Sequence, residues 1–230
     1  MLGKALLFVL ALSGVLLGSG CGSSASEDLP TTMPPASASN PRGQAYPVDH
    51  LGTRQRQGRT PGDRIANLSF RGLRSGATAG SELETLSLAD YYDPTATDHS
   101  VLYIFAAASW CAICARVARE LESHGPELEA RGARILVVLV NGESQGAGPS
   151  LGEFEKFAQR HPLPLDLAVD VRATALGVYG LQGVPFNLLI DARSMEILDA
   201  SVGEADLDTY VGAGTSFTAA NPVSYPLSPP

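Results

Sequence analysis

The sequence contains few cysteines and few basic residues. Three cysteines in 230 residues are too few for a small scaffold held together by disulfides, so each cysteine has to be interpreted from its neighbours. The 16 Lys and Arg residues are outnumbered by 24 Asp and Glu residues, which gives a formal net charge of -8. The sequence has no Lys/Arg cluster that could neutralise a row of phosphates, so we expect no nucleic-acid partner.

The apolar run near the start of the chain is too short to cross a bilayer comfortably. It covers residues 5–17, follows a single basic residue, Lys4, and is succeeded by the small residues Gly18, Ser19 and Gly20. A basic residue, a short apolar stretch and small residues are typical of an export signal. We therefore interpret residues 1–20 as a signal peptide.

Cys21 follows these small residues directly and resembles the lipid-modified cysteine of bacterial lipoproteins. Leu17 stands one position further back than the lipoprotein pattern prefers, so ordinary cleavage after Gly20 is the alternative. The resemblance implies a membrane anchor through a lipid on Cys21, in the bacterial cell envelope and facing the periplasm. Gly22 follows in place of Asp, and the outer membrane is slightly favoured.

Two polar, proline-rich segments flank the central part of the chain. Residues 21–61 contain mainly small and polar residues, with five prolines between positions 30 and 47 and no apolar periodicity. Such a composition predicts a disordered tether with a root-mean-square span of about 35 Å. Residues 215–230 are again rich in proline and polar residues, and we expect them to be unstructured as well.

Residues 62–214 have the pattern of one α/β domain. Nearly continuous apolar runs at residues 101–107 and 133–140 are typical of strands buried on both faces. Further strands are predicted at 64–72, 85–92 (with a helical turn), 165–169, 186–191 and 196–202. Helices are predicted at 111–131, 151–160, 171–179 and 204–211, the first of them kinked or broken at Gly125-Pro126. The alternation predicts a sandwich with a mixed, mainly parallel central sheet and a terminal antiparallel pair.

Two motifs lie at the ends of predicted strands. Trp110-Cys111-Ala112-Ile113-Cys114 follows the first buried strand, and Gly183-Val184-Pro185 precedes another strand about seventy residues later. With both motifs, the sequence resembles the thioredoxin superfamily over residues 62–211. It looks most like the membrane-anchored extracytoplasmic branch (TlpA/ResA-like), which implies a three-layer thioredoxin-like sandwich and thiol-disulfide exchange.

The Cys-x-x-C spacing suits this chemistry. Thiol-disulfide exchange needs an attacking thiolate and a second thiol that releases the resulting mixed disulfide. At a strand-to-helix junction the first cysteine lies at the helix N-terminus, which favours negative charge, and the second lies one turn further and is shielded. We therefore predict that Cys111 is the nucleophile, that Cys114 is the resolving thiol, and that the two form the redox disulfide.

The resemblance also implies the remaining parts of the site. Pro185 would follow a cis peptide bond facing the cysteines, and Val184 would offer backbone groups to an extended substrate. Trp110 would flank the site as an apolar contact surface, or it is simply a half-buried aromatic beside a turn. The expected partners are protein thiols or disulfides of the cell envelope, with the protein a monomer and with no cofactor or metal.

The sequence departs from the family at two positions. Thioredoxins carry a buried Asp six residues before the first cysteine, where this chain has Phe105. The anchored reducing branch often carries Glu six residues after that cysteine, where this chain has Val117. Glu120 lies on the same predicted helix. The direction of exchange is not fixed by these residues, because potentials in the superfamily range from about -270 to -120 mV.

Several other functions are weighed against this one. A zinc site would need about four ligands, and His50, His99, His124 and His161 show no ligand spacing. Copper delivery would require three residues between the cysteines. A peroxidase of the peroxiredoxin group would carry Thr three residues before its cysteine, where Ala108 stands. A purely structural disulfide and a non-catalytic or metal-delivery binding lipoprotein are the remaining alternatives.

Overall fold

The computed structural model describes residue 29 and residues 32–48, 59–173, 175–179 and 182–222. The predicted signal peptide and Cys21 lie outside these residues. Within them, a seven-stranded sheet forms the centre of the molecule, with strand order β2-β1-β5-β4-β3-β6-β7. The strands are β1 Ser69–Leu73, β2 Glu84–Ser87, β3 Val101–Ala108, β4 Ala133–Asn141, β5 Asp166–Val169, β6 Phe186–Asp191 and β7 Glu196–Val202.

The central strands β3 and β4 are buried on both faces, as their apolar runs predict. All eight residues of β3 are buried, because the alternating side chains point into two separate hydrophobic clusters. The parallel pairings are β3 with β4 and β4 with β5. The other four pairings are antiparallel. The sheet is thus mixed, as predicted, but it is not mainly parallel, because parallel pairing is confined to the three neighbouring strands β3, β4 and β5.

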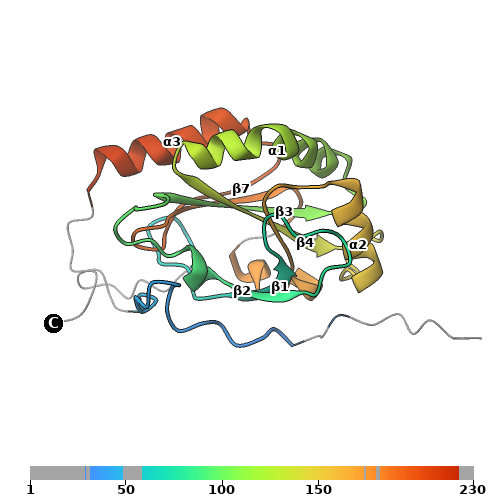
Figure 1. The fold of residues 1–230 in the computed structure, drawn as a ribbon. Helices are drawn as coiled ribbons and strands as arrows, with labels where there is room; N and C mark the ends of the chain where they lie inside the picture. The colour runs from blue at the N-terminus through green and yellow to red at the C-terminus, as the bar shows by residue number, and fades with distance from the viewer. Residues whose placement is uncertain (1–28, 30–31, 49–58, 174, 180–181, 223–230) are drawn as a thin grey trace, which may run out of the picture.

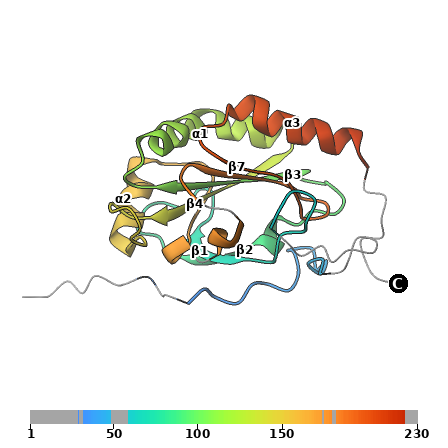
Figure 2. The same ribbon diagram turned by 180° about the vertical axis from the view of Figure 1, so that it is seen from behind.

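Three α-helices cover one face of the sheet: α1 Ala112–Ala130, α2 Leu151–Arg160 and α3 Leu207–Ala220. The apolar residues of all three belong to one buried cluster with the same face of β3 and β4. Helices α1 and α3 lie side by side above the sheet in both views (Figures 1 and 2). The opposite face is covered by the 3-10 helices η1 Leu88–Tyr91 and η3 Leu176–Tyr179 and by the segment around Ile65.

Helix α1 runs without a break through Gly125-Pro126, so the predicted interruption there is wrong. Pro126 lies inside the helix with its ring exposed, and its missing N–H removes a single backbone hydrogen bond. Gly125 is buried, and a Cβ at this position would lie 2.9 Å from Leu165 Cδ1. The glycine therefore allows the close approach of the loop before β5.

Two further helix predictions are corrected by the structure. Residues 171–179 form two short 3-10 turns, η2 Val171–Ala173 and η3, rather than one helix. Helix α3 continues past the predicted end at residue 211 and includes residues 215–220, which were expected to be unstructured. Thr218 is buried and its Oγ1 donates to Ser100 Oγ at 2.8 Å. Tertiary packing thus sustains a helix whose composition is unfavourable.

Part of the predicted tether is docked on the domain, so the expectation of disorder is wrong for residues 32–48, which we call the strap. Asn40 Nδ2 donates to Tyr92 O at 2.8 Å, and Tyr46 Oη donates to Ile65 O at 2.8 Å. Both side chains belong to residues that are only 4% exposed. Isolated apolar and polar side chains fix this strap although it has no secondary-structure period.

Candidate active site

The predicted nucleophile lies where β3 passes into α1. Cys111 is the N-cap residue of the helix, with extended backbone angles. Its backbone N–H donates to Ala108 O at 3.1 Å, and its Sγ accepts from the backbone N–H of Cys114 at 3.0 Å. The sulfur thus occupies the place of a capping oxygen, where N–H groups and the helix dipole favour negative charge.

Cys111 and Cys114 are joined by a disulfide, with their Cα atoms 5.2 Å apart. Cys114 is completely buried, whereas Cys111 keeps 6% of its surface exposed. Ala112 and Ile113, between them, are exposed. An incoming thiol or disulfide can therefore reach only the first sulfur, and this asymmetry suits an attacking and a resolving cysteine.

The sheet brings the second motif to the same place. Strands β3 and β6 are antiparallel neighbours with Ala106 opposite Phe186, so the start of β6 lies beside the end of β3. The Val184–Pro185 peptide bond is cis, as the resemblance implied. Val184 O lies 3.8 Å from Cys111 Sγ.

A cleft of about 230 Å³ adjoins the disulfide. The cleft is lined by Trp110, Val140, Asn141, Gln145, Gly146, Ala173, Gln182, Gly183 and Val184. Trp110 is 41% exposed and Ile113 is 44% exposed. The ring of Trp110 is thus partly exposed at the cleft rather than buried in the core.

Asn141, Gln145 and Gln182 are cleft residues that the sequence did not reveal. Asn141 ends β4 and Gln145 lies in the loop that follows, so a Gly-rich loop after a buried strand was the available signal. Ser109 adds a further polar group. Its Oγ is buried and, within the described part of the chain, has no hydrogen-bond partner.

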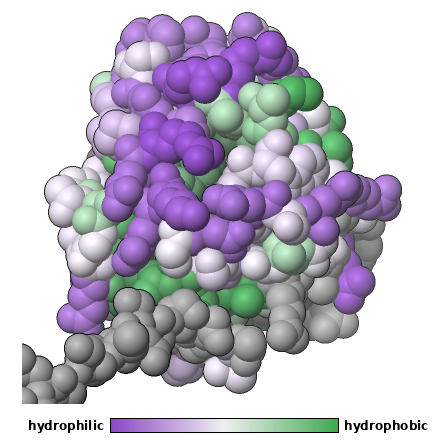
Figure 3. Space-filling view, turned by 90° about the vertical axis from the view of Figure 1, so that its right-hand side faces the viewer, coloured by the Kyte–Doolittle hydropathy of each residue, from purple (hydrophilic) through white to green (hydrophobic). Residues whose placement is uncertain are grey.

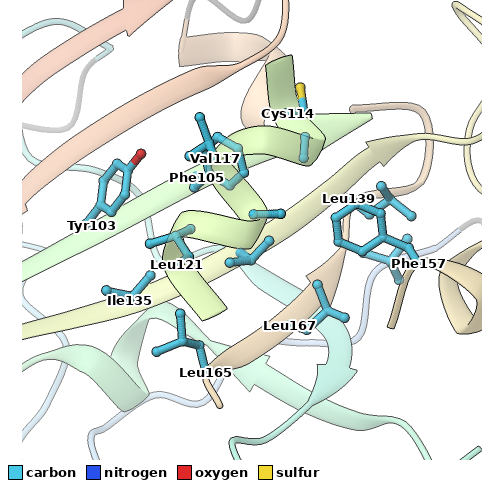
Figure 4. Close-up of a cluster of buried hydrophobic side chains, with 14 of the residues drawn as sticks. Tyr103, Phe105, Cys114, Val117, Leu121, Ile135, Leu139, Phe157, Leu165 and Leu167 are labelled. Carbon is cyan, nitrogen blue, oxygen red and sulfur yellow. The ribbon is translucent and has the colours of Figure 1, made fainter. Parts of the chain in front are cut away.

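Apolar side chains occupy both positions where relatives carry an acid. Phe105 on β3 and Val117 on α1 are buried in the same cluster as Cys114 (Figure 4). Glu120 is partly buried on the same helix. It is near enough to Tyr103 to contribute, after burial and Tyr210, to the raised pKa of that phenol. Cys114 itself is thus surrounded by hydrocarbon.

Three of the four histidines, His99, His124 and His161, belong to the described residues, and His50 lies outside them. No group of three or more His, Cys, Asp or Glu residues is found in the described ranges. His161 caps the end of α2, and its Nδ1 is 2.8 Å from Glu122 Oε1. Among the described residues, no helix is long and apolar enough to cross a membrane.

The surface at the carboxyl end of β3 is mixed in character. Figure 3 views the molecule from the right-hand side of Figure 1, toward which β3 points. Mostly hydrophilic side chains cover this side, interrupted by hydrophobic areas at its upper right and along its lower part (Figure 3). The exposed Trp110 and Ile113 show that apolar surface lies next to the cysteines.

Comparisons with known proteins agree with this fold. A family model described as AhpC/TSA family matches residues 62–200. No curated protein matches the chain. A putative thiol:disulfide interchange protein DsbE from Chlorobium tepidum is 21% identical, with a TM-score of 0.51 over 70% of this chain and 98% of its own.

Two other solved structures are similar. The exposed lipoprotein thioredoxin Etrx1 from Streptococcus pneumoniae is 21% identical, with a TM-score of 0.50 over 66% of this chain and 99% of its own. The mitochondrial 2-Cys peroxiredoxin from Plasmodium falciparum is 10% identical, with a TM-score of 0.53 over 72% of this chain and 99% of its own. These likenesses show a thioredoxin-like fold.

Proposed function

The chain belongs to the AhpC/TSA family of thioredoxin-like proteins, and from this premise we propose that it is an extracytoplasmic thiol-disulfide oxidoreductase acting on protein substrates. The family and the fold support thiol-disulfide redox activity in general. The finer assignment rests on one observation. An N-capping Cys111, partly exposed, is disulfide-bonded to a fully buried Cys114 and lies 3.8 Å from the carbonyl oxygen of Val184.

In the reduced protein, the Cys111 thiolate attacks one sulfur of a substrate disulfide. A mixed disulfide forms, and the other substrate sulfur leaves as a thiolate that takes up a proton. Cys114 then loses its proton and attacks Cys111 Sγ, which releases the second substrate thiol and leaves the Cys111–Cys114 disulfide. Two electrons pass from the protein to the substrate, and the reverse sequence oxidises a substrate dithiol.

The surroundings divide the work between the two thiols. Backbone N–H groups at the start of α1 stabilise negative charge on Cys111. Cys114 is surrounded by apolar side chains, which disfavour a free thiolate, and the acid positions of relatives are filled by Phe105 and Val117. We infer that water entering beside the substrate carries the proton of Cys114, so resolution is the slow half of the reaction.

The experiment that tests this function measures the redox state of Cys111 and Cys114 in glutathione buffers, together with reduction of insulin. We expect the pair to cycle between dithiol and disulfide and to reduce insulin disulfides. A pair that stays oxidised throughout, with no reduction of insulin, would overturn the proposal in favour of a structural disulfide. A Cys114→Ala variant in cells should trap a substrate on Cys111.

We further propose a membrane anchor through a lipid on Cys21. The support is the lipoprotein-like sequence around that residue and the fold shared with an exposed lipoprotein thioredoxin. The mass of the mature N-terminus tests it, because lipidation adds acyl groups to Cys21, whereas ordinary cleavage after Gly20 leaves a free thiol. The domain then acts on cell-envelope thiols as a monomer.

Peroxide reduction is the activity that the family name also raises. In this chain Ala108 occupies the position three residues before Cys111 where the peroxiredoxin group has Thr, and alanine has no hydroxyl to bind a peroxide. We therefore expect hydrogen peroxide to oxidise the reduced pair far more slowly than a protein disulfide does. A faster reaction with peroxide would reassign the site.

A further inference from the structure

A chain of hydrogen bonds, buried at its Tyr103 end and partly buried at Gly203, connects the core of the sheet to the cis-proline turn. Tyr103 Oη donates to Asn187 Oδ1 at 2.7 Å, and Asn187 Nδ2 donates to Gly203 O at 2.9 Å. Gly203 N–H in turn donates to Pro185 O at 2.8 Å. Tyr103 is completely buried and Asn187 is 2% exposed, so water cannot replace these bonds easily.

The chemistry of the donors fixes the direction of the chain. The carbonyl oxygen of Gly203 can only accept, so the Asn187 amide must present its NH₂ group there and its oxygen to Tyr103. Burial, followed by the effects of Tyr210 and Glu120, raises the pKa of Tyr103 well above its usual value. The phenol therefore keeps its proton and donates a hydrogen bond to Asn187 Oδ1.

Gly203 forms the corner that follows β7, and this corner contacts the cis-proline turn. Gly203 has φ +111°, a conformation that favours glycine. The neighbouring Val202 is 54% exposed, and its Cγ1 would lie 3.3 Å from a Cβ at Gly183. The corner thus contacts the same turn from which Val184 O faces Cys111 Sγ.

We propose that Asn187, supported by Tyr103, is a positioning residue for thiol-disulfide exchange with extended protein substrates. Asn187 touches neither cysteine. It holds the Gly203 corner against the Val184–Pro185 turn, and so fixes the cleft lined by Trp110 and Val184. This cleft is the groove in which a polypeptide must lie for its disulfide to reach Cys111. This inference rests on the proposed function. A small disulfide does not need the groove, whereas a protein substrate does.

The test compares two substrates in two variants. Asn187→Leu removes, at similar volume, the side-chain hydrogen bonds to Tyr103 and Gly203 and a longer one, at 3.5 Å, to Ser201 O. We expect kcat/KM for insulin to fall by about tenfold. The rate with hydroxyethyl disulfide should change by less than about twofold, because this molecule reaches Cys111 without the groove. Tyr103→Phe should shift the ratio of the two rates in the same direction and less strongly, since the hydrogen bonds donated by Asn187 Nδ2 survive.

Tyr91→Phe is the matched control. Tyr91 also donates a buried hydrogen bond, from Oη to Asp166 Oδ2 at 2.8 Å, but on a different part of the sheet. We expect Tyr91→Phe to lose about as much thermal stability as Tyr103→Phe. The ratio of the insulin rate to the hydroxyethyl disulfide rate should equal that of the wild type. A ratio that Asn187→Leu leaves unchanged, or that Tyr91→Phe shifts equally, would overturn the positioning role.

Hydrogen exchange at the Gly203 amide provides a readout without catalysis. In the oxidised protein, Asn187→Leu should speed exchange of this amide several-fold relative to amides of β4. The variant loses the hydrogen bond from Asn187 to Gly203 O and keeps only the one from Gly203 N–H to Pro185 O. Unchanged exchange would overturn the inference even in a fully active enzyme. Conversely, a wild-type protein that reduces neither substrate would refute the proposed function, while the faster exchange would still support the structural chain.

Discussion

At its C-terminal end β3 leads to Cys111, the exposed Trp110 and the turn at Val184, whereas the segment before its N-terminal end, residues 93–98, is bonded to the strap through Arg42. The first end exposes apolar surface, and the hydroxyl of Ser109 there has no hydrogen-bond partner among the described residues. The second end is closed by the strap. Arg42 of the strap pairs there with Asp93 and Asp98. Under the proposed function, the comparison teaches that the molecule separates the redox site from the strap contacts along one strand, because an end that is to bind substrates must leave surface uncovered.

The fastening end is organised around Asp93. Its side chain is 1% exposed and accepts hydrogen bonds from the backbone N–H groups of Asp98 and His99 and from Arg42 of the strap. Burial acts to raise the pKa of Asp93, but hydrogen bonds from Asp98, Thr97 and His99 outweigh it, and the pKa is lowered. Asp93 is therefore ionised and fixed in place.

The first prediction breaks the reactive end alone. Cys111→Ser should lower the rate of insulin reduction by about 1000-fold or more, because a hydroxyl is a far weaker nucleophile than a thiolate. The free energy of unfolding should change little, because so short a disulfide loop constrains the unfolded chain weakly. Insulin turbidity and thermal unfolding measure the two quantities.

Cys114→Ser is the companion variant for this prediction. It keeps the nucleophile and removes the resolving thiol, so a mixed disulfide on Cys111 should accumulate. If Cys111→Ser retained activity while Cys114→Ser lost it, the assignment of the two roles would be reversed.

The second prediction breaks the fastening end alone. Asp93→Ala leaves the backbone donors and Arg42 without their acceptor, and we expect a loss of about 3 kcal/mol in the free energy of unfolding. Asp98→Ala is the control, because Asp98 also pairs with Arg42 but its side chain is 68% exposed, so the loss should be below about 1 kcal/mol. Urea unfolding measures both.

Activity distinguishes the two ends in this experiment. The kcat for insulin of folded Asp93→Ala protein should equal that of the wild type at a temperature where both are folded. A lowered kcat would show that the strap is coupled to the redox site and would contradict the separation.

The third prediction concerns pH. Burial lowers the pKa of His99, against the opposing effects of the Tyr91 carbonyl and of Asp93. The folded state therefore binds a proton less readily at His99 than the unfolded chain, whose pKa is about 6.5. Stability from this residue is present above that pH and is lost as the pH falls below it.

Urea unfolding between pH 7 and pH 5 tests this expectation. The wild type should lose stability as the pH falls, by less than Asp93→Ala loses at pH 7, and His99→Gln should flatten the profile. Asp93 does not obscure the result, because its contribution is lost only at lower pH, below about 3.9. A profile with the same slope in His99→Gln would assign the pH dependence to another group.

The reactive end was largely predictable from the sequence, and the fastening end was not. Trp110-Cys111-Ala112-Ile113-Cys114 and Val184-Pro185 are contiguous motifs beside apolar runs. The spacing of Cys111 and Cys114 predicts their chemistry, and the resemblance to the thioredoxin superfamily implies the place of Val184-Pro185. The contacts of Asn40, Arg42 and Tyr46 involve single side chains within a proline-rich segment. Such contacts have no period, so composition predicted disorder.

The same distinction explains the positioning chain and the last helix. Asn187 stands within a predicted strand, but its partners Tyr103 and Gly203 are distant in sequence, and only the pairing of β3, β6 and β7 joins them. The second half of α3 contains residues with poor helix propensity and is sustained by Gly214 against Leu189 and by Thr218. Local propensity does not predict long-range packing of this kind.

The last and smallest effect concerns Arg42, which joins the strap to two carboxylates. Its side chain is 41% exposed, and its guanidinium lies 3.2 Å from Asp93 Oδ1 and 2.6 Å from Asp98 Oδ2. Because water and salt screen a partly exposed pair, Arg42→Ala should cost only about 0.5–1 kcal/mol at low ionic strength. Raising the salt concentration to about 1 M should reduce the difference from the wild type, since the Debye length falls to about 3 Å.

Asn40 is the useful contrast, because its side-chain amide is neutral and donates a hydrogen bond to Tyr92 O. Asn40→Ala should cost more than Arg42→Ala, and its cost should not depend on salt. If Arg42→Ala proved the costlier change at every salt concentration, the strap would be held mainly by charge. Its release would then be governed by ionic strength rather than by local unfolding, and the fastening end would be less permanent than its buried hydrogen bonds indicate.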